Sequence, residues 1–257
     1  LEDAAAMFPS LALLRQVKQD ARYHEEGDVY RHTQLVCQAL TESAQWQQLS
    51  KEAKGIVYLA AMFHDIGKLT ATREDATGIS SPKHTIYGER LFRSAVYTGS
   101  INDLPFASDF KPGWGLSFAQ REQVAALIRF HGLPVWFAEK SNPQKALLFA
   151  AERVCLHWLF LLALADHRGR ISRTKEDFQD RISYFAECAE EYGCLYGPYP
   201  FADACSRTAY FYKKDGWPGA KIYDSSRSSV TVLCGLPLSG KDTYIAAHLA
   251  KLPVVSL

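Results

Sequence analysis

The sequence predicts a mainly α-helical bundle followed by the beginning of a separate α/β domain. Up to about residue 192, apolar residues recur at intervals of three and four, the period of a helix with one buried face. After Gly193 the pattern changes, and aromatic residues stand among glycine and proline. The apolar run 230–234 then precedes a glycine-rich loop, so we expect it to form a short buried strand. With 47% hydrophobic and 22% charged residues, the composition is that of a folded chain and not of a disordered one.

Start signals delimit the predicted helices. Asp28 and Ser50 stand before amphipathic segments and can cap them. Ser81-Pro82 indicates another start, with the proline at the first helical position. The apolar segment 142–169 is predicted to be one long helix at the centre of the bundle. In chain order, we expect helices over 9–19, after Asp28, after Ser50, from Pro82, and over 117–130, 142–169 and 174–192.

We therefore divide the chain into three parts. Residues 1–195 are the helical domain, 196–228 an aromatic-rich connector, and 229–257 the start of a nucleotide-binding domain. A single strand, loop and helix do not make an α/β domain, because such a strand needs neighbours to bury it. We expect this last domain to be cut off near its start and the tail to be poorly ordered unless it docks elsewhere.

Charge and cysteine content restrict the function classes. The chain has 29 Lys and Arg against 28 Asp and Glu, so no overall basic field favours a nucleic-acid or membrane partner. The most apolar stretch, 154–165, is interrupted by His157 and is shorter than the roughly 20 residues that cross a bilayer, so we predict no membrane partner. The six cysteines show no C-x-x-C pair, which favours reduced thiols and a cytoplasmic location.

Polar residues with metal-binding chemistry interrupt the most apolar helices. His32, Asp65 and Asp166 each lie on an apolar face, where burial is unfavourable unless a partner satisfies the side chain. The adjacent His64 and Asp65 can face one point where a helix ends, and we expect Gly67 to supply that end. Each histidine taken singly is more often an ordinary hydrogen-bonded core residue. Taken together, the set favours a shared cation.

The order of His32, His64-Asp65 and Asp166 resembles the HD-domain superfamily of metal-dependent phosphohydrolases, over residues 8–192. The segments 24–33, 64–68 and 166–170 most resemble the HD domain of bacterial CCA-adding enzymes. The resemblance implies that His32, His64, Asp65 and Asp166 hold one metal. Two-metal members of the superfamily hold a second ion, bridged by the aspartate, and this implies a site formed by Asp65, His84 and His131.

Imidazole and carboxylate ligands suit Mn, Fe, Co, Ni or Zn, so the implied cofactors are two divalent transition metals. Such an ion lowers the pKa of bound water towards about 7. Lys68 would stabilise charge beside the site, or it is a solvated lysine at a helix end. Arg168 and Arg170 suit contacts with phosphate, or they lie in a solvated loop. His24 would give a proton to the leaving oxygen, with a capping or surface role as the alternative.

The C-terminal segment carries a phosphate-binding pattern. Strand 230–234, the loop G-x-x-x-x-G-K at 235–241 and a helix over 244–252 follow the order of a P-loop. Asp242 stands where serine or threonine usually helps to hold Mg²⁺, and a chance match is the alternative. The predicted nucleotide-binding residues are Gly235, Ser239, Gly240, Lys241, Asp242 and Thr243.

An HD domain followed by such a loop resembles the bacterial bifunctional RNA end-healing family, whose loop is similar to that of phage-type polynucleotide kinases. The resemblance implies removal of 2′,3′-cyclic, 2′- or 3′-phosphate from RNA ends, and 5′-phosphorylation with Mg²⁺ and ATP or GTP. The catalytic acid of such kinases would fall beyond residue 257, so we expect no kinase activity from this chain. The alternatives are a phosphohydrolase of free nucleotides and a non-catalytic nucleotide- or RNA-binding module with a structural metal. For RNA contact, the sequence offers Arg168, Arg170, Arg173 and Lys175, and the aromatics of 192–223.

Overall fold

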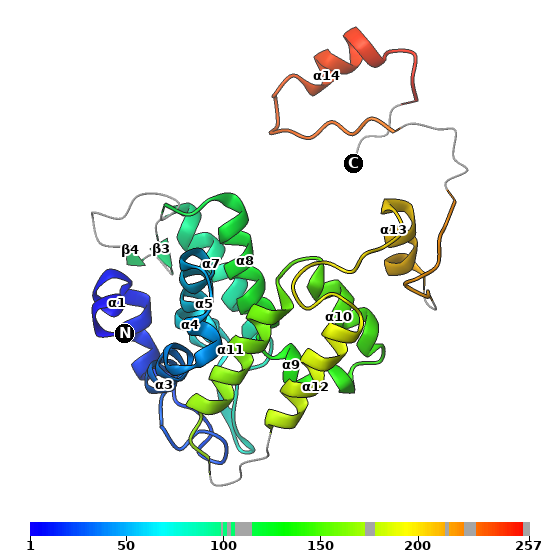
Figure 1. Ribbon diagram of the computed structural model, residues 1–257. Coiled ribbons are helices and arrows are strands. Elements are labelled where there is room, and N and C mark those ends of the chain that lie inside the picture. The colour runs from blue at the N-terminus through cyan, green and yellow to red at the C-terminus, as the bar shows by residue number, and fades with distance from the viewer. Residues whose placement is uncertain are drawn as a thin grey trace. The chain divides into compact units, whose positions relative to one another are not determined.

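The computed structural model describes residues 1–98, 100–101, 104–105, 115–172, 178–213, 216–223 and 230–253. The chain forms two units, 1–201 and 202–257. The first unit is mainly α-helical, as the sequence predicts (Figure 1). Its elements, in chain order, are α1 (Glu2–Met7), α2 (Pro9–Leu13), a 3₁₀ turn (Leu14–Gln16), α3 (Val29–Glu42), α4 (Ala44–Gln47), α5 (Lys51–Phe63), α6 (Lys68–Ala71), β1 (Arg73–Asp75), β2 (Gly78–Ser80), α7 (His84–Thr98), β3 (Ser100–Ile101), β4 (Leu104–Pro105), α8 (Phe118–Phe130), α9 (Leu133–Trp136), a 3₁₀ turn (Phe137–Glu139), α10 (Pro143–Ala151), α11 (Leu156–Gly169) and α12 (Phe178–Glu191).

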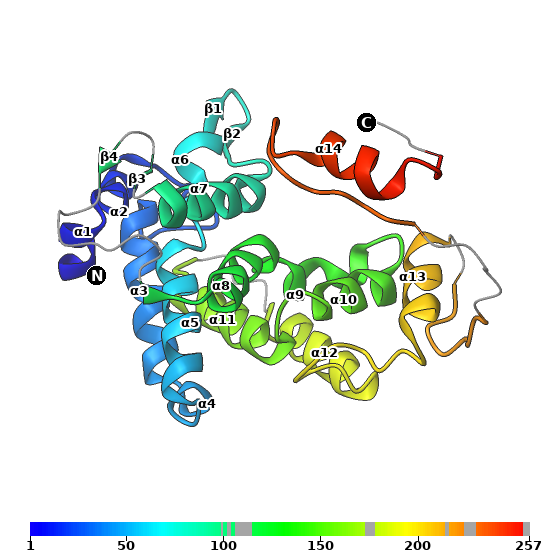
Figure 2. The ribbon, with the colours of Figure 1, turned by 90° about the horizontal axis from the view of Figure 1, so that it is seen from above.

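Helix α11 is the centre of this unit. It packs against α3, α5, α8, α9 and α12, and Figures 1 and 2 show α3 and α5 on one side of it and α9 and α12 on the other. Leu159, Leu162 and Ala165 on α11 are almost fully buried. The caps predicted at Asp28 and Ser50 are present, and Ser117 caps α8 as well: each side chain accepts a hydrogen bond from the backbone N–H group at the third helical position.

The predicted long helix over 142–169 is wrong, because the chain breaks into α10 and α11 with a bend of 109° between them. Gln123 of α8 stabilises the break: its amide donates to the carbonyl of Arg153, and its side-chain oxygen accepts the N–H of Cys155. A tertiary contact thus replaces the hydrogen bonds that a continuous helix would make. Among the described residues, no single helix is long and apolar enough to cross a membrane; α10 and α11 meet that test only as a bent pair.

Three further elements differ from prediction. The helix expected over 9–19 ends as α2 at Leu13 and a 3₁₀ turn at Gln16, and Lys18 instead forms a β-bridge with Asp28. Lys83 has φ 60°, so α7 begins at His84 and not at Pro82. The chain from Arg73 to Ser80 forms an antiparallel hairpin, β1–β2, which we did not predict from its exposed, mostly polar residues. The predicted start of α12 at Thr174 lies outside the described residues.

The second unit contains α13 (Ala204–Tyr212), α14 (Lys241–Tyr244) and a π-helical turn (Ile245–Leu249). The predicted strand 230–234 is wrong: the segment has no strand partner among the described residues, and Val230 and Val232 are exposed. An isolated strand has no ladder hydrogen bonds and no covering layer, so nothing fixes it as a strand. The helix of the tail begins at Lys241 and not at Tyr244, and no α/β domain surrounds it in the described chain.

Candidate metal centre

The His64-Asp65 pair lies in the turn that follows α5. The helix ends at Phe63, and in the turn beyond it His64 Nε2 and Asp65 Oδ2 lie 3.2 Å apart. Gly67 does not supply the helix end as we expected, since α5 already ends at Phe63 and Gly67 has a right-handed φ of −67°. It instead allows close packing: a Cβ at Gly67 would lie 2.0 Å from the carbonyl oxygen of His84. This contact sets the start of α7, and with it His84, against Asp65.

A second close approach joins α3 and α11. A Cβ at Gly169, at the end of α11, would lie 2.6 Å from the backbone nitrogen of Val36. Because the two helices touch there, Asp166 on α11 reaches His32 on α3, and His32 Nε2 lies 3.0 Å from Asp166 Oδ1. Two ligands that are 134 residues apart in the sequence thus become direct neighbours.

Asp65 lies between two groups of histidines, and each of its carboxylate oxygens faces one group. Oδ2 is 3.2 Å from His64 Nε2 and 3.8 Å from His32 Nε2. Oδ1 is 3.5 Å from His84 Nε2 and 3.9 Å from His131 Nε2. The two histidines of the second group lie 3.3 Å apart, Nε2 to Nε2. A carboxylate placed in this way can bridge two ions. The six predicted ligands therefore come together as two candidate groups, His32–His64–Asp166 and Asp65–His84–His131.

The donor atoms fit divalent transition metals. His64 Nε2 is buried without a hydrogen-bond partner, and such an atom is destabilising unless something binds it. His64, His84 and His131 each use Nδ1 on a backbone carbonyl three residues earlier, which leaves Nε2 for the centre. Two carboxylates and four imidazoles are the ligand chemistry of Mn, Fe, Co, Ni or Zn.

The electrostatics of the centre favour charged carboxylates and a neutral His131. Burial would raise the pKa of Asp65, but the Lys68 ammonium and His64 hold it well below its ordinary range. Burial would likewise raise the pKa of Asp166, but the hydrogen bond with His32 outweighs burial and lowers this pKa well below its ordinary value. Burial and the neighbouring His64 lower the pKa of His131 to about 3. Ionised carboxylates and neutral imidazole are the forms that bind cations.

Lys68 points into the centre and not into solvent. Its Nζ lies 2.8 Å from Asp65 Oδ2 and donates to Gln19 Oε1 at 2.7 Å, and its side chain is mostly buried. Gln19, which is buried as well, was not among the sequence-predicted site residues. Lys68 thus places a positive charge directly beside the candidate ligands, which is the position that charge stabilisation of a phosphate requires.

Sequence reasoning also missed Glu26. Its side chain is fully buried, and one carboxylate oxygen, Oε1, lies 2.7 Å from His24 Nδ1 and 2.9 Å from His32 Nδ1. Burial would raise the pKa of Glu26, but hydrogen bonds with His24 and His32 hold it below its ordinary range. Two adjacent glutamates in a polar segment gave no signal that one of them would be buried.

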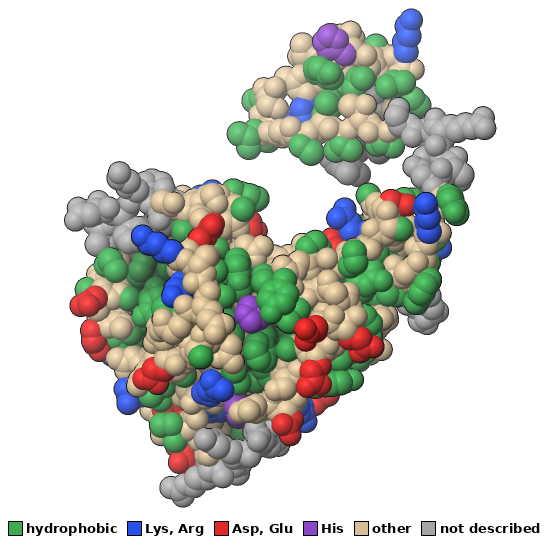
Figure 3. Space-filling model, viewed as in Figure 1, with side chains coloured by type: hydrophobic (Ala, Val, Ile, Leu, Met, Phe, Trp, Pro, Cys, Tyr) green, Lys and Arg blue, Asp and Glu red, His purple; other side chains and the backbone are tan. Residues whose placement is uncertain are grey.

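The predicted basic residues divide between the centre and the surface. Arg170 Nη2 lies 3.6 Å from Asp166 Oδ1, whereas Arg168 is exposed. His24 lies beside His32, with ring centroids 5.0 Å apart, and burial lowers its pKa, which favours the neutral form over a proton-donating one. Arg173 and Lys175 lie outside the described residues. On the face in Figure 3, acidic and basic side chains are interspersed, in keeping with the balanced charge.

Comparison with known proteins gives one distant relative. The Multifunctional CCA protein of Pasteurella multocida (strain Pm70) is 29% identical over 188 residues. The match covers 68% of this chain, and the chain spans only 38% of that protein. No family model matches the sequence, and no solved structure matches it significantly. This distant homology and the His/Asp groups together indicate an HD-type metal-dependent phosphohydrolase.

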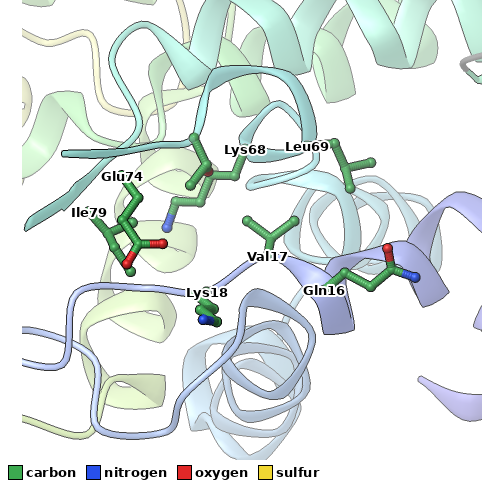
Figure 4. A pocket seen from close by; sticks show the side chains of 8 residues that line it. Gln16, Val17, Lys18, Lys68, Leu69, Glu74 and Ile79 are labelled. Atoms are coloured by element: carbon green, nitrogen blue, oxygen red, sulfur yellow. The ribbon is translucent and has the colours of Figure 1, made fainter.

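A cavity of about 350 Å³ lies beside the centre and shares Lys68 with it. Figure 4 shows Lys68 and Leu69, the 16–18 segment and the β1–β2 hairpin around the same space. Val17, Leu69 and Ile79 give this cavity an apolar part, whereas Lys18, Lys68 and Glu74 give it charge. The unpredicted hairpin therefore supplies one wall of a space that shares Lys68 with the candidate metal centre.

The glycine-rich loop of the second unit has a different character. Gly240 has φ 85°, a left-handed conformation that suits glycine, and α14 follows it directly. Lys241 Nζ donates to the carbonyls of Gly235 and Leu236, so its charge is used within its own loop. Ser239, Asp242 and Thr243 are exposed.

Proposed function

We propose that this chain is a metal-dependent phosphoesterase that removes 2′,3′-cyclic, 2′- or 3′-phosphate from RNA ends. The observation that carries the proposal is the arrangement at Asp65. Its two carboxylate oxygens face two separate histidine groups, and Lys68 Nζ contacts one of these oxygens, Oδ2. The similarity to a protein named for CCA, and the resemblance of 24–33, 64–68 and 166–170 to CCA-adding enzymes, support an RNA end as the substrate.

The chain's own residues would act on the phosphate in three ways. His32, His64, Asp65 and Asp166 would hold one ion, and Asp65, His84 and His131 the other. When bound, such ions supply hydroxide at neutral pH and positive charge against phosphate oxygens. Lys68 and Arg170 would add charge where it develops in the transition state, and their fixed positions avoid reorganisation during the reaction.

The cavity beside Lys68 would receive the nucleoside that carries the phosphate. Its apolar part suits the face of a base, and its polar residues suit a ribose. Val17→Trp should fill the cavity and raise KM for a nucleotide substrate, while hydrolysis of bis-p-nitrophenyl phosphate, which has no nucleoside, stays unchanged. An equal effect on both substrates would argue against this placement.

The tail would belong to a polynucleotide 5′-kinase module that uses Mg²⁺ with ATP or GTP. Support for this part is confined to the sequence pattern at 235–243 and to the left-handed Gly240 before α14. It stands independently of the phosphoesterase proposal, because the two rest on different residues.

The decisive experiment compares substrates with the purified chain loaded with Mn²⁺, Co²⁺ or Ni²⁺. We expect a higher kcat/KM for RNA with a 2′,3′-cyclic phosphate end than for free 2′,3′-cyclic mononucleotides. A preference for free nucleotides would indicate a nucleotide phosphohydrolase instead. Tight metal binding without hydrolysis of either substrate would indicate a non-catalytic module with a structural metal, since a structural site has no open coordination position.

A further inference from the structure

The four histidines of the centre differ in how the proton on Nδ1 is held. A histidine that binds a cation through Nε2 must carry its proton on Nδ1, and that N–H needs an acceptor. His64 and His131 directly follow the ends of α5 and α8, and His84 is the first residue of α7. At these positions, Nδ1 of each histidine bonds the carbonyl three residues earlier, at 2.8–2.9 Å.

His32 cannot bond the carbonyl three residues earlier in this way, because His32 lies inside α3. The carbonyl three residues before it belongs to Val29, which already accepts the hydroxyl of Thr33 at 2.8 Å in addition to its place in the helix ladder. A charged group comes from the loop before the helix: Glu26 Oε1 lies 2.9 Å from Nδ1, within ion-pair distance, although Nδ1 forms no hydrogen bond of full geometry there. Of the four histidines, His32 is therefore the one whose Nδ1 faces a charged acceptor.

Glu26 is itself held in place by the chain that follows α11. Its Oε2 accepts the backbone N–H of Ile171 at 3.0 Å, and the carbonyl of Ile171 accepts the N–H of Glu25 at 2.7 Å. Ile171 follows α11, the helix that carries Asp166. The buried carboxylate thus connects the loop before α3 to the chain that follows Asp166, and it holds together the two segments that supply His32 and Asp166.

We propose that Glu26 is a positioning residue that keeps the His32 proton on Nδ1 and directs Nε2 at the group formed with His64 and Asp166. The inference assumes the metal centre of the proposed function, but it does not depend on the substrate. A carboxylate acceptor raises the basicity of the imidazole more than a carbonyl does. Glu26 therefore strengthens the binding of the ion at His32 and leaves the ion at His84 and His131 unaffected.

A direct ligand role for Glu26 is the competing explanation, since His24, Glu26 and His32 also lie close together. An ion there would take His32 through Nδ1 while Nε2 faces Asp166 at 3.0 Å. Binding ions at both nitrogens would require the imidazole to lose both protons, which is far less favourable than one hydrogen bond and one ligand bond. The protonation of the imidazole therefore favours Glu26, 2.9 Å from Nδ1, as the acceptor of the Nδ1 proton and not as a ligand.

The test is a Zn²⁺ titration of Glu26→Gln against a chromophoric competing chelator. The amide keeps the shape of the side chain but removes its charge. Glu25→Gln, at the exposed neighbouring position, is the matched control. We expect Glu26→Gln to weaken one of the two binding steps by about 10- to 100-fold and to leave the other, and the control, unchanged. If Glu26→Gln left both Zn²⁺ binding steps unchanged, the proposal would be overturned. It would also be overturned if the unmodified chain bound a third ion that Glu26→Gln lost, because Glu26 would then be a ligand.

A measurement on the unmodified chain keeps the proposal testable if the variant does not fold. In the Zn²⁺-loaded, ¹⁵N-histidine-labelled protein, His32 should show the tautomer with the proton on Nδ1 and a strongly downfield N–H resonance. A proton on Nε2 of His32 would overturn the proposal. Equal weakening of both binding steps, with loss of helical circular dichroism, would assign Glu26 a structural role only. None of these readouts depends on hydrolysis, so failure of the proposed function would be seen separately.

Discussion

The two units of this chain each carry a short polar motif, and the motifs have opposite surroundings. In the helical unit, His64 and Asp65 are almost fully buried, and residues from α3, α7 and α11 contact Asp65 or its neighbours. In the second unit, Lys241 bonds two carbonyls of its own loop, and the preceding segment 230–234 is mostly exposed. Both motifs are short stretches of sequence. Among the described residues, however, only the His64-Asp65 motif is surrounded by packed helices.

The difference shows what a motif needs before it can do chemistry. Burial strengthens electrostatic interactions and shifts pKa values, whereas exposed groups are screened by water. At Asp65 the surrounding charges overcome burial and keep the carboxylate ionised. The glycine-rich loop has the backbone conformation at Gly240 but lacks covering layers in the described structure. We therefore expect substitutions in the helical unit to have large effects and those in the tail to have small ones.

The largest effect is expected at Asp65. Asp65→Asn keeps the shape but removes the negative charge that faces both histidine groups, so both ions should be lost and phosphoesterase activity abolished. Bound metal measured by mass spectrometry, together with the RNA-end assay, tests this. Asp180→Asn, on the exposed face of α12, should change neither quantity. An active Asp65→Asn variant would refute the bridging role.

The next effect is expected at Gly67. Gly67→Ala would place a methyl group against the backbone of His84 and Gly88, which cannot move as a side chain can. We expect a loss of about 1–3 kcal/mol in the free energy of unfolding, and weaker binding of the ion at His84 and His131. Gly55→Ala is the control in open space within α5, and it should stabilise the chain by about 0.5–1 kcal/mol.

Thermal and denaturant unfolding of both glycine variants measure these changes. Equal stability of Gly67→Ala and the unmodified chain would show that α7 can shift away from the turn of His64 and Asp65 without loss of stability. The conclusion that close backbone packing positions His84 would then be wrong.

A smaller effect is expected at Lys68, whose charge lies beside the ligands but which we do not count among them. Lys68→Ala should lower kcat by roughly 100-fold and change KM little, because the charge matters most in the transition state. Steady-state kinetics with the RNA end test this, with Lys51→Ala at the exposed start of α5 as control. A raised KM with unchanged kcat would show that Lys68 only holds the substrate.

The smallest effect is expected in the tail. Lys241→Ala removes hydrogen bonds within one exposed loop, so phosphoesterase activity and the melting temperature of the helical unit should stay the same. We also expect this 257-residue chain to show no 5′-kinase activity with Mg²⁺ and ATP or GTP. A robust 5′-kinase activity that Lys241→Ala abolishes would show that the loop functions in its present surroundings.

The local features of the sequence were sufficient to predict most of the helices of the first unit. Capping by Asp28 and Ser50 depends on residues within four positions of each other, and these contacts form as predicted. The break between α10 and α11 was not predictable in this way, because it depends on Gln123 from a separate helix. Strand 230–234 fails for the same reason, since a strand needs partners that its own residues do not encode.

In the candidate site, too, some features follow from the local sequence and others only from the tertiary structure. The types and order of His32, His64, Asp65 and Asp166 are a property of the sequence alone, because ligand chemistry belongs to the side chains. Tertiary structure decided the rest: Gly67 and Gly169 allow backbones to touch, Asp65 directs one oxygen at each histidine group, and the buried Glu26 carboxylate lies 2.9 Å from His32 Nδ1. These relations join segments far apart in the chain. They depend on how the helices pack, and no local pattern of residues specifies that packing.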